Sequence, residues 1–249
     1  MQLLIEMEFD DELVLPIGHH HILQSVIYHN LKAYPEYSRH LHDLGYSEKN
    51  RHFKMFTFGP LSGRYRIRSK EICFTDTIQF EIRSPEPMMI RILEESVKEN
   101  GITFGSTRSA GIRTKLNDKT VEQDMIHIRM KSPVTVRSTD PISKRTTFYN
   151  PDDPEFSMKI NDNFARKYKA FYGIEPTGRI SVEPVRITDR DRYVTKYQGF
   201  FIRGWLGDYV LSGERKYLDF LYQTGLGEKN AQGFGMFDVI DKRGKENEA

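Results

Sequence analysis

The sequence contains almost no cysteine: Cys73 is the only one among 249 residues. A single cysteine excludes an intrachain disulfide framework and a zinc site built from several cysteines. The chain also has no run of about 18 apolar residues, so no transmembrane helix is expected. Its first residues lack the basic start and long apolar run of a signal peptide. These absences predict a soluble, cytoplasmic protein with no membrane partner.

The net charge is only +2, because the sequence has 37 Lys and Arg and 35 Asp and Glu. The positive and negative charges are nevertheless concentrated in different segments. Residues 1–20 contain five acidic residues and no Lys or Arg. Four cations follow at every second position, which would place them on one face of a strand: Arg64, Arg66, Arg68 and Lys70. Residues 106–145 add nine basic residues against four acidic ones. Such surfaces can bind a polyanion, although a solvated sheet face would show the same pattern.

The histidines are concentrated in one region: seven of the eight lie in the first 52 residues. Imidazole both gives and takes protons near pH 7, so this region is a candidate for acid–base chemistry. His19, His20 and His21 are consecutive, and no framework of carboxylates or cysteines accompanies them. We therefore predict neither a metal site nor a cofactor.

The first half of the chain alternates between strand and helix patterns. Period-two alternation, helical stripes and glycine stops indicate the order strand–helix–strand–strand–helix–strand. The expected elements cover residues 2–9, 20–32, 53–58, 65–80, 87–99 and 102–106, with a further short helix over 36–44. This is the order of a ferredoxin-like domain.

The same order recurs in the second half. The expected elements cover residues 125–136, 153–172, 178–188, 194–207, 213–224 and 234–240. We predict an α+β protein of two tandem ferredoxin-like domains, of the kind also found in RRM proteins. Their expected bounds are 1–118 and 119–249, with the junction inside residues 107–121.

A glycine-rich loop separates the last expected helix from the last strand. It contains Gly225, Gly227, Gly233 and Gly235, together with Lys229. It lacks the spacing of a dinucleotide-binding fingerprint and the Gly-Lys-Ser/Thr of a Walker A loop, which excludes both nucleotide-binding folds. Its amides and Lys229 could face a phosphate, or the loop could be a connection packed against the sheet.

The loop sequence is more specific as a family signature. Gly225-Leu226-Gly227-Glu228-Lys229-Asn230, followed by Gly233-Phe234-Gly235-Met236, resembles the C-terminal signature of the CRISPR-associated endoribonucleases that process precursor CRISPR RNA, members of the RAMP superfamily. The N-terminal half resembles the family's landmarks in order: Leu15-Pro16-Ile17, Leu23–Tyr28, His40-Leu41-His42-Asp43 and Phe53–Phe58. The similarity spans nearly the whole chain.

The resemblance implies a metal-independent antiviral-defence nuclease that cuts within CRISPR repeat RNA. In such enzymes a ribose 2′-hydroxyl attacks the adjacent phosphate and leaves 2′,3′-cyclic phosphate and 5′-hydroxyl ends. By position, His42 matches the general acid/base, Tyr28 an assisting tyrosine, and Lys54 a lysine that stabilises the transition state. His40 is the alternate histidine. The resemblance leaves open whether the protein forms a homodimer or joins a CRISPR effector complex.

Other readings of the same residues remain. Tyr28 could be an aromatic at the rim of the core, His42 a surface residue, and Lys54 a solvated charge. One alternative function is a RAMP-fold protein that binds repeat RNA without cutting it, or that serves as an effector-complex subunit. Another is a general pair of RRM domains, but the sequence lacks the aromatic-rich strand that RRM domains use for base stacking.

Overall fold

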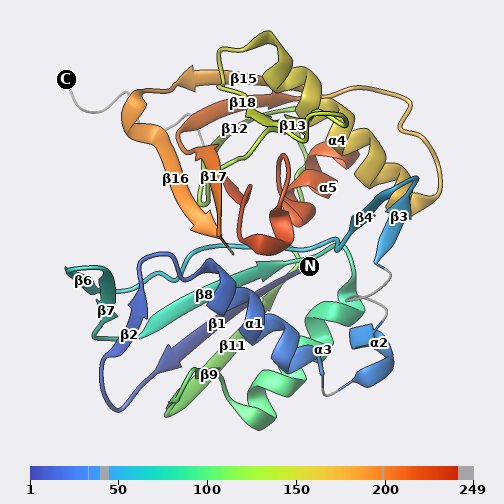
Figure 1. Ribbon diagram of the computed structural model, residues 1–249. Helices are drawn as coiled ribbons and strands as arrows, with labels where there is room; N and C mark the ends of the chain where they lie inside the picture. Colours follow the sequence, from blue (N-terminus) through green and yellow to red (C-terminus); the bar gives the residue numbers. More distant parts are fainter. Residues whose placement is uncertain (33, 40–44, 198, 241–249) are drawn as a thin grey trace, which may run out of the picture. The chain divides into compact units, whose positions relative to one another are not determined.

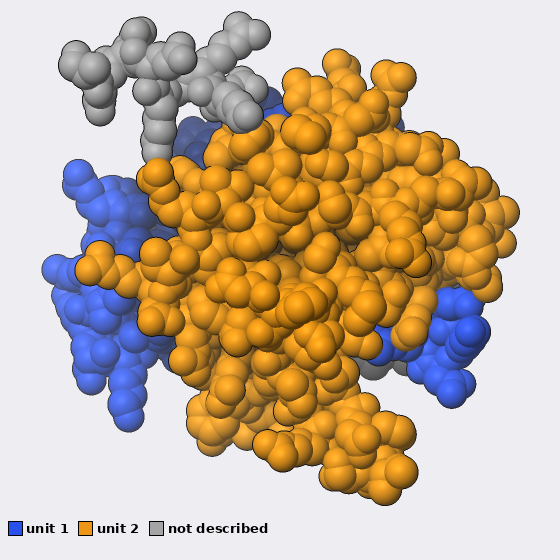
Figure 2. All heavy atoms as spheres, turned by 90° about the horizontal axis from the view of Figure 1, so that it is seen from above, with its two compact units in different colours: residues 1–119, 231–233 blue, residues 120–230, 234–249 orange. Residues whose placement is uncertain are grey.

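The structure, a computed structural model, describes residues 1–32, 34–39, 45–197 and 199–240 (Figure 1). The chain forms two compact units, coloured separately in Figure 2. The first unit comprises Met1–Lys119 and Ala231–Gly233, and the second comprises Thr120–Asn230 and Phe234–Ala249. A short piece of the glycine-rich loop thus belongs to the first unit although it lies far along the sequence.

The first unit is built on a four-stranded antiparallel sheet. Its strands and helices follow in the order β1 (Gln2–Glu8), α1 (His20–Leu31), β5 (Thr57–Phe58), β8 (Ile78–Arg83), α3 (Pro87–Asn100) and β11 (Gly111–Asn117). The sheet order is β11-β1-β8-β5, so the fourth strand pairs with the first and the second strand lies at an edge. This is the ferredoxin-like topology.

The alternation in the sequence explains this sheet. Leu3, Ile5 and Met7 of β1 are buried, whereas Glu6 and Glu8 lie on the opposite face. Helices α1 and α3 pack together over the apolar face, and their buried side chains join those of β1 and β8 in one core (Figure 1). The helices therefore cover one face of the sheet and leave the other to polar residues.

Two expectations for the first half are wrong in detail. The fourth strand is β11, whereas residues 102–106 contribute only to a small hairpin of β9 (Thr103–Phe104) and β10 (Thr107–Arg108). The reason is that Gly105 turns the chain with a φ of +61° before a long strand can form. The stretch 65–80 is also not one strand but three: β6 (Tyr65–Arg68), β7 (Glu71–Phe74) and the start of β8.

Shorter elements complete the first unit. Strands β2 (Leu13–Pro16), β7 and β6 form a three-stranded sheet in that order. Between α1 and β5 lie α2 (Pro35–Arg39) and a hairpin of β3 (Tyr46–Glu48) and β4 (Arg51–Phe53). The connection that follows α1 is therefore long, and in sequence it contains three of the clustered histidines: His40, His42 and His52.

The second unit repeats the topology. Its core elements are β12 (Met125–Met130), α4 (Pro154–Tyr172), β15 (Ser181–Arg186), β18 (Asp208–Ser212), α5 (Arg215–Thr224) and β19 (Phe237–Val239). The antiparallel sheet order is β15-β18-β12-β19, which again pairs the fourth strand with the first. The prediction of two tandem ferredoxin-like domains in an α+β protein is confirmed.

The stretch 194–207, expected to be one core strand, has a different structure. It belongs to a separate hairpin of β16 (Arg192–Tyr197) and β17 (Phe200–Trp205), and the third core strand is β18. Gly199, with a φ of +89°, lies between β16 and β17. A second small hairpin, of β13 (Arg137–Thr139) and β14 (Thr146–Phe148), precedes α4.

Among the helices of the described residues, none is both long enough and apolar enough to cross a bilayer.

Candidate functional site

Tyr28 lies on α1, at the rim of the first unit's core. Its side chain is half-buried and packs against the buried cluster. Its ring meets that of Phe56 edge to face, with centroids 6.1 Å apart. Because Phe56 follows Lys54 by only two residues, the fold brings α1 and the chain after β4 together at this point.

Lys54 lies in the short connection between β4 and β5. A Cβ placed on Gly45 would lie 3.3 Å from Lys54 Cδ and 3.4 Å from its Nζ, so the lysine side chain lies along the Gly45 backbone. The next residue, Met55, is a buried non-glycine residue with a φ of +49°. This strained conformation is often found at functional sites, where surrounding contacts hold it.

The candidate acid/base residues His42 and His40 lie outside the described residues. Of the proposed catalytic residues, the structure therefore describes Tyr28 and Lys54. Among the described residues, no group of three or more His, Cys, Asp or Glu side chains is arranged to hold a metal ion.

The predicted positive stripe lies on a hairpin that we call the first ribbon, formed by β6 and β7. Arg64 and Arg66 extend toward acidic residues: Arg64 lies 3.6 Å from Asp76, and Arg66 contacts Glu12. Arg68 approaches the same Glu12 at 3.4 Å. These arginines are exposed, but Glu12 and Asp76 partly neutralise them.

Lys70 departs from the expected stripe. Strand β6 ends at Arg68, and Lys70 lies in the turn before β7, after Ser69 with a φ of +56°. The expected alternation therefore holds within β6 for Arg66 and Arg68, whereas Arg64 lies just before the strand and Lys70 in the turn after it.

The other predicted basic segment, residues 106–145, is also partly neutralised. Arg129 makes two bonds of 2.7 Å to the carboxylate of Asp208. Arg113 contacts Glu8 at 2.7 Å and Glu6 at 3.5 Å. Carboxylates from neighbouring strands thus offset charges that look isolated in the sequence.

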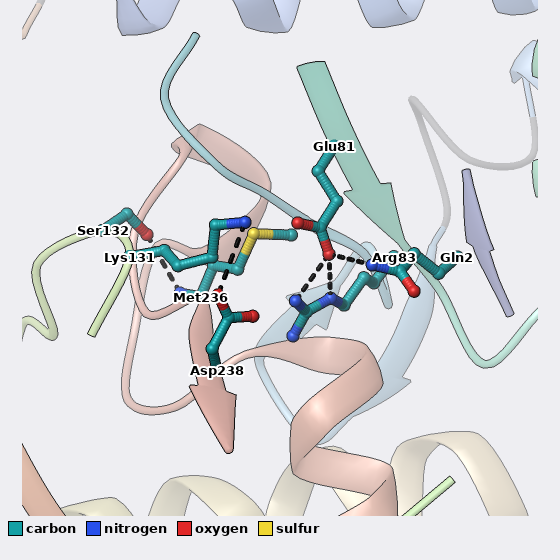
Figure 3. Close-up of polar contacts among 7 residues, drawn as sticks. All are labelled: Gln2, Glu81, Arg83, Lys131, Ser132, Met236 and Asp238. Atoms are coloured by element: carbon teal, nitrogen blue, oxygen red, sulfur yellow. Dashed lines mark hydrogen bonds and ion pairs between the residues drawn. The ribbon is translucent and has the colours of Figure 1, made fainter. Parts of the chain in front are cut away.

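Two further polar clusters appear in Figure 3, one in each unit. In the first unit, Glu81 accepts a 2.5 Å hydrogen bond from Arg83 Nε and another from Gln2. Both Glu81 and Arg83 are buried, and their pairing compensates the removal of two charges from water. In the second unit, Lys131 lies 3.6 Å from Asp238. These pairs have a structural explanation that needs no ligand.

The glycine-rich loop is a packed element of the structure. All four of its glycines, Gly225, Gly227, Gly233 and Gly235, are buried. A Cβ on Gly235 would lie 2.0 Å from Leu226 O, which no side chain could tolerate. The glycines therefore allow close backbone approach within the loop. Their contact with RNA stays a prediction.

A buried lysine that the sequence reasoning missed holds this loop. Lys167 of α4 donates to Gly225 O at 2.7 Å and to Asn230 Oδ1 at 2.9 Å. Asn230 Nδ2 in turn donates to Leu226 O and Phe234 O, which closes the loop on itself. Burial lowers the pKa of Lys167 to about 7. The signal in the sequence was a lysine at a position on the core-facing side of the helix expected over residues 153–172.

Two residues of the loop segment 231–233 contact elements of the first unit. Gln24 Nε2 on α1 donates to Ala231 O at 2.6 Å. A Cβ on Gly233 would lie 2.7 Å from the Phe58 ring, so only glycine fits there. Nearby Lys229 is half-buried, and burial followed by the charge of Arg137 lowers the pKa of its amine.

The structure also reveals a surface that the sequence reasoning missed. We call the hairpin of β16 and β17 the second ribbon. Arg192, Lys196 and Arg203 are exposed, and their pairing register places them on one face with Phe201. Phe201 is 68% exposed, and Phe200 on the other face is 77% exposed. Among the described residues, none of the three cations has an ion-pair partner.

This combination of exposed cations and aromatic rings is typical of a nucleic-acid-binding surface. Cations track phosphates, and exposed rings stack on unpaired bases. The alternation of Arg192, Val194 and Lys196 was the signal that could have identified it.

Comparison with known proteins agrees with this organisation. The two tandem ferredoxin-like domains and the glycine-rich loop are the features on which the resemblance to RAMP proteins rests. Residues 116–239 match the family model described as CRISPR associated protein Cas6, C-terminal. Over 99% of this chain and 96% of the relative, the sequence is 25% identical to CRISPR-associated endoribonuclease Cas6 1 of Methanocaldococcus jannaschii. The chain belongs to the Cas6 family, and the resemblance stated from the glycine signature is confirmed.

Solved structures show the same fold. One, titled CRISPR associated protein Cas6, is 24% identical with a TM-score of 0.77 and is matched over 97% of this chain and 99% of its own. Another, titled an RAMP protein binding different RNA substrates, is 21% identical with a TM-score of 0.80, over 97% and 100% of the two chains.

Proposed function

We propose that this protein is a metal-independent endoribonuclease that binds precursor CRISPR RNA and cuts it within the repeat. The carrying observation is the similarity over 99% of the chain to a CRISPR-associated endoribonuclease. The proximity of Tyr28 to the chain that follows Lys54 supports it, because both proposed groups lie in the first unit. The catalytic residues would thus lie in the N-terminal domain, residues 1–118, and the glycine-rich loop in the domain of residues 119–249.

The proposed reaction is an internal transesterification. The 2′-oxygen forms a bond to the adjacent phosphorus, and the bond from phosphorus to the 5′-oxygen breaks. The 2′-hydroxyl proton passes to a general base, and a general acid protonates the departing 5′-oxygen. The products are a 2′,3′-cyclic phosphate and a 5′-hydroxyl, and no oxidant or cofactor is consumed.

Each proposed residue has one role in this scheme. His42, with His40 as the alternate, transfers a proton, and Tyr28 assists it. Proton transfer by a positioned group contributes about 10²–10⁴-fold to the rate. The Lys54 amine stabilises the negative charge that develops on the phosphorane oxygens.

The RNA backbone would be held by cations outside the catalytic group. The second ribbon offers exposed cations and rings, the first ribbon offers partly neutralised arginines with Lys70 in its turn, and Lys229 lies in the glycine-rich loop. Contact of the loop's glycines with RNA belongs to the same proposal. A cytoplasmic location follows from the proposal, because the transcript is made there.

One assay tests the reaction. Purified protein is incubated in EDTA with labelled repeat RNA, and in parallel with the same RNA carrying one 2′-deoxy nucleotide at the cut site. We expect cleavage of the first RNA and none of the second. A requirement for Mg²⁺ would contradict the mechanism. Binding without cleavage would instead favour the alternative, a non-catalytic RAMP-fold protein or effector-complex subunit.

The histidine assignment is tested in the same assay. We expect His42→Ala to lower the single-turnover rate at least about tenfold while RNA affinity stays nearly unchanged. Full activity in that variant, with the loss found in His40→Ala, would move the role to His40. Size-exclusion chromatography with and without RNA tests the homodimer, and co-purification of other CRISPR proteins tests the effector complex.

A further inference from the structure

Glu86 lies immediately before α3, where two tyrosine hydroxyls converge on its carboxylate. Tyr37 of α2 donates to Oε2, and Tyr46 of β3 donates to Oε1. One carboxylate therefore joins α3 to two elements of the long connection that follows α1.

The two tyrosines act as hydrogen-bond donors. Burial, and then the hydrogen bond to Glu86, raise the pKa of Tyr37 and also the pKa of Tyr46. Both hydroxyls consequently stay protonated at neutral pH and keep donating. Their role in this cluster is to fix geometry.

The backbone of Glu86 is tied to the chain that carries Lys54. Glu86 N donates to Ser84 Oγ at 3.1 Å, and Ser84 Oγ donates to Met55 O at 2.8 Å. Ser84 is fully buried, so these bonds are shielded from water. Met55 directly follows Lys54.

A second path from Glu86 reaches the Lys54 side chain. Tyr46 follows Gly45, whose backbone lies along Lys54 Cδ and Nζ. A Cβ on Gly45 would also lie 2.6 Å from Phe53 O, so the strand before Lys54 approaches closely as well. The Glu86 carboxylate thus holds the backbone that borders the lysine amine, while its main chain holds the residue after the lysine.

We propose that Glu86 is a positioning residue that fixes the Gly45–Tyr46 backbone against Lys54 and so sets where the lysine amine points. This inference rests on the proposed function, in which that amine stabilises the transition state. A misplacement of about 1 Å can lower a rate by about 10²-fold, so this arrangement affects cleavage more than RNA binding.

The test compares Glu86→Ala, at the start of α3, with a matched control within that helix. Glu95→Ala removes a 2.7 Å hydrogen bond from Tyr34, which is also a tyrosine–carboxylate contact. We expect Glu86→Ala to lower the single-turnover rate about tenfold or more, with RNA affinity changed less than about threefold. Glu95→Ala should change neither. If Glu86→Ala folds poorly, Tyr46→Phe serves as a second variant. It keeps the ring, removes one hydrogen-bond donor to Glu86 and should reproduce part of the loss in cleavage rate.

A double-mutant cycle separates positioning from a general loss of stability. In a Lys54→Ala background, Glu86→Ala should lower the rate by less than about twofold, because the amine it positions is gone. A full additional loss in that background would overturn the proposal, as would wild-type rates in both Glu86→Ala and Tyr46→Phe. If the wild-type protein itself does not cut repeat RNA, the proposed function fails and the positioning role fails with it.

Discussion

The two ferredoxin-like domains each carry a hairpin in the connection between their second and third sheet strands, and the two hairpins differ in how their charges are compensated. In the first ribbon, Glu12 contacts both Arg66 and Arg68. In the second ribbon, the three exposed cations have no ion-pair partner among the described residues. Topology therefore explains where a hairpin occurs, whereas the acidic residues that fold beside it decide how much positive charge remains for a ligand.

The domains also differ in which connection is elaborated. In the first, the long connection follows the first helix and contains Lys54 and, in sequence, His40, His42 and His52. In the second, the glycine-rich loop follows the second helix and is held by buried Lys167. The same fold thus places candidate chemistry in one domain and a packed structural loop in the other.

The largest effect on RNA affinity is expected when the cations of the second ribbon are replaced. The combined variant Arg192→Ala, Lys196→Ala and Arg203→Ala should weaken RNA binding by about a hundredfold at low salt, because three phosphate contacts are lost. The slope of log affinity against log salt should fall by about 2, since each contact contributes about 0.7 on single strands. Filter binding at several salt concentrations measures both quantities.

The matched control is the same combined substitution in the first ribbon. Equal losses in the two variants would show that the ion pairs of the first ribbon do not matter for RNA and would break the comparison. An unchanged affinity in the second-ribbon variant would remove that ribbon from the RNA-binding surface.

An intermediate effect, on stability, is expected at Lys167. Lys167→Met leaves Gly225 O and Asn230 Oδ1 without this donor, which should lower the free energy of unfolding by about 1–3 kcal/mol. The difference should depend on pH. The folded-state pKa is about 7 and the ordinary value is 10.5, so between these values the unfolded chain binds more protons. Wild-type stability should therefore rise with pH across this window relative to the variant.

Urea unfolding of both proteins at pH 6.5 and pH 9 measures this difference. A gap between wild type and Lys167→Met that is the same at both pH values would contradict a buried lysine with a lowered pKa. If Lys167→Met also left RNA affinity unchanged, the loop would be shown to tolerate the loss of this support.

The smallest effect on RNA affinity is expected when the arginines of the first ribbon are replaced. Replacing Arg64, Arg66 and Arg68 by alanine should weaken RNA binding less than about threefold, because carboxylates already offset their charge. Glu12→Gln should act in the opposite direction and strengthen binding slightly by releasing two arginines. A loss of affinity in Glu12→Gln would show that this carboxylate orders the ribbon for RNA.

Much of the fold could be predicted because its signals are local. The stripe Leu23, Val26, Ile27 and Leu31 predicts α1, and the glycine after Asn100 predicts the end of α3. Strand β11 was missed because Gly111, Asn117 and Asp118 gave the segment 107–121 the composition of a linker. Part of the second ribbon was predicted to be one strand because strand-forming residues lie on both sides of Gly199. The turn at this single glycine breaks what otherwise looks like a continuous run.

The site was less accessible to sequence reasoning, for a physical reason. Glu12 and Arg66 are 54 positions apart, and Glu86 lies 49 positions from Tyr37. Contacts at such separations depend on the register of the sheets, which no local pattern contains. Lys54 and Tyr28 were chosen as candidates because a family motif supplies the long-range information that their own residue types lack.

The assignment of residues 231–233 to the first unit has a consequence for biosynthesis. Ala231 accepts its hydrogen bond from Gln24, and Gly233 fills the space beside Phe58, so these contacts form only after the ribosome has made nearly the whole second domain. Domains usually fold in the order in which they emerge. Here the contacts that complete the first unit form only after most of the second unit has been translated.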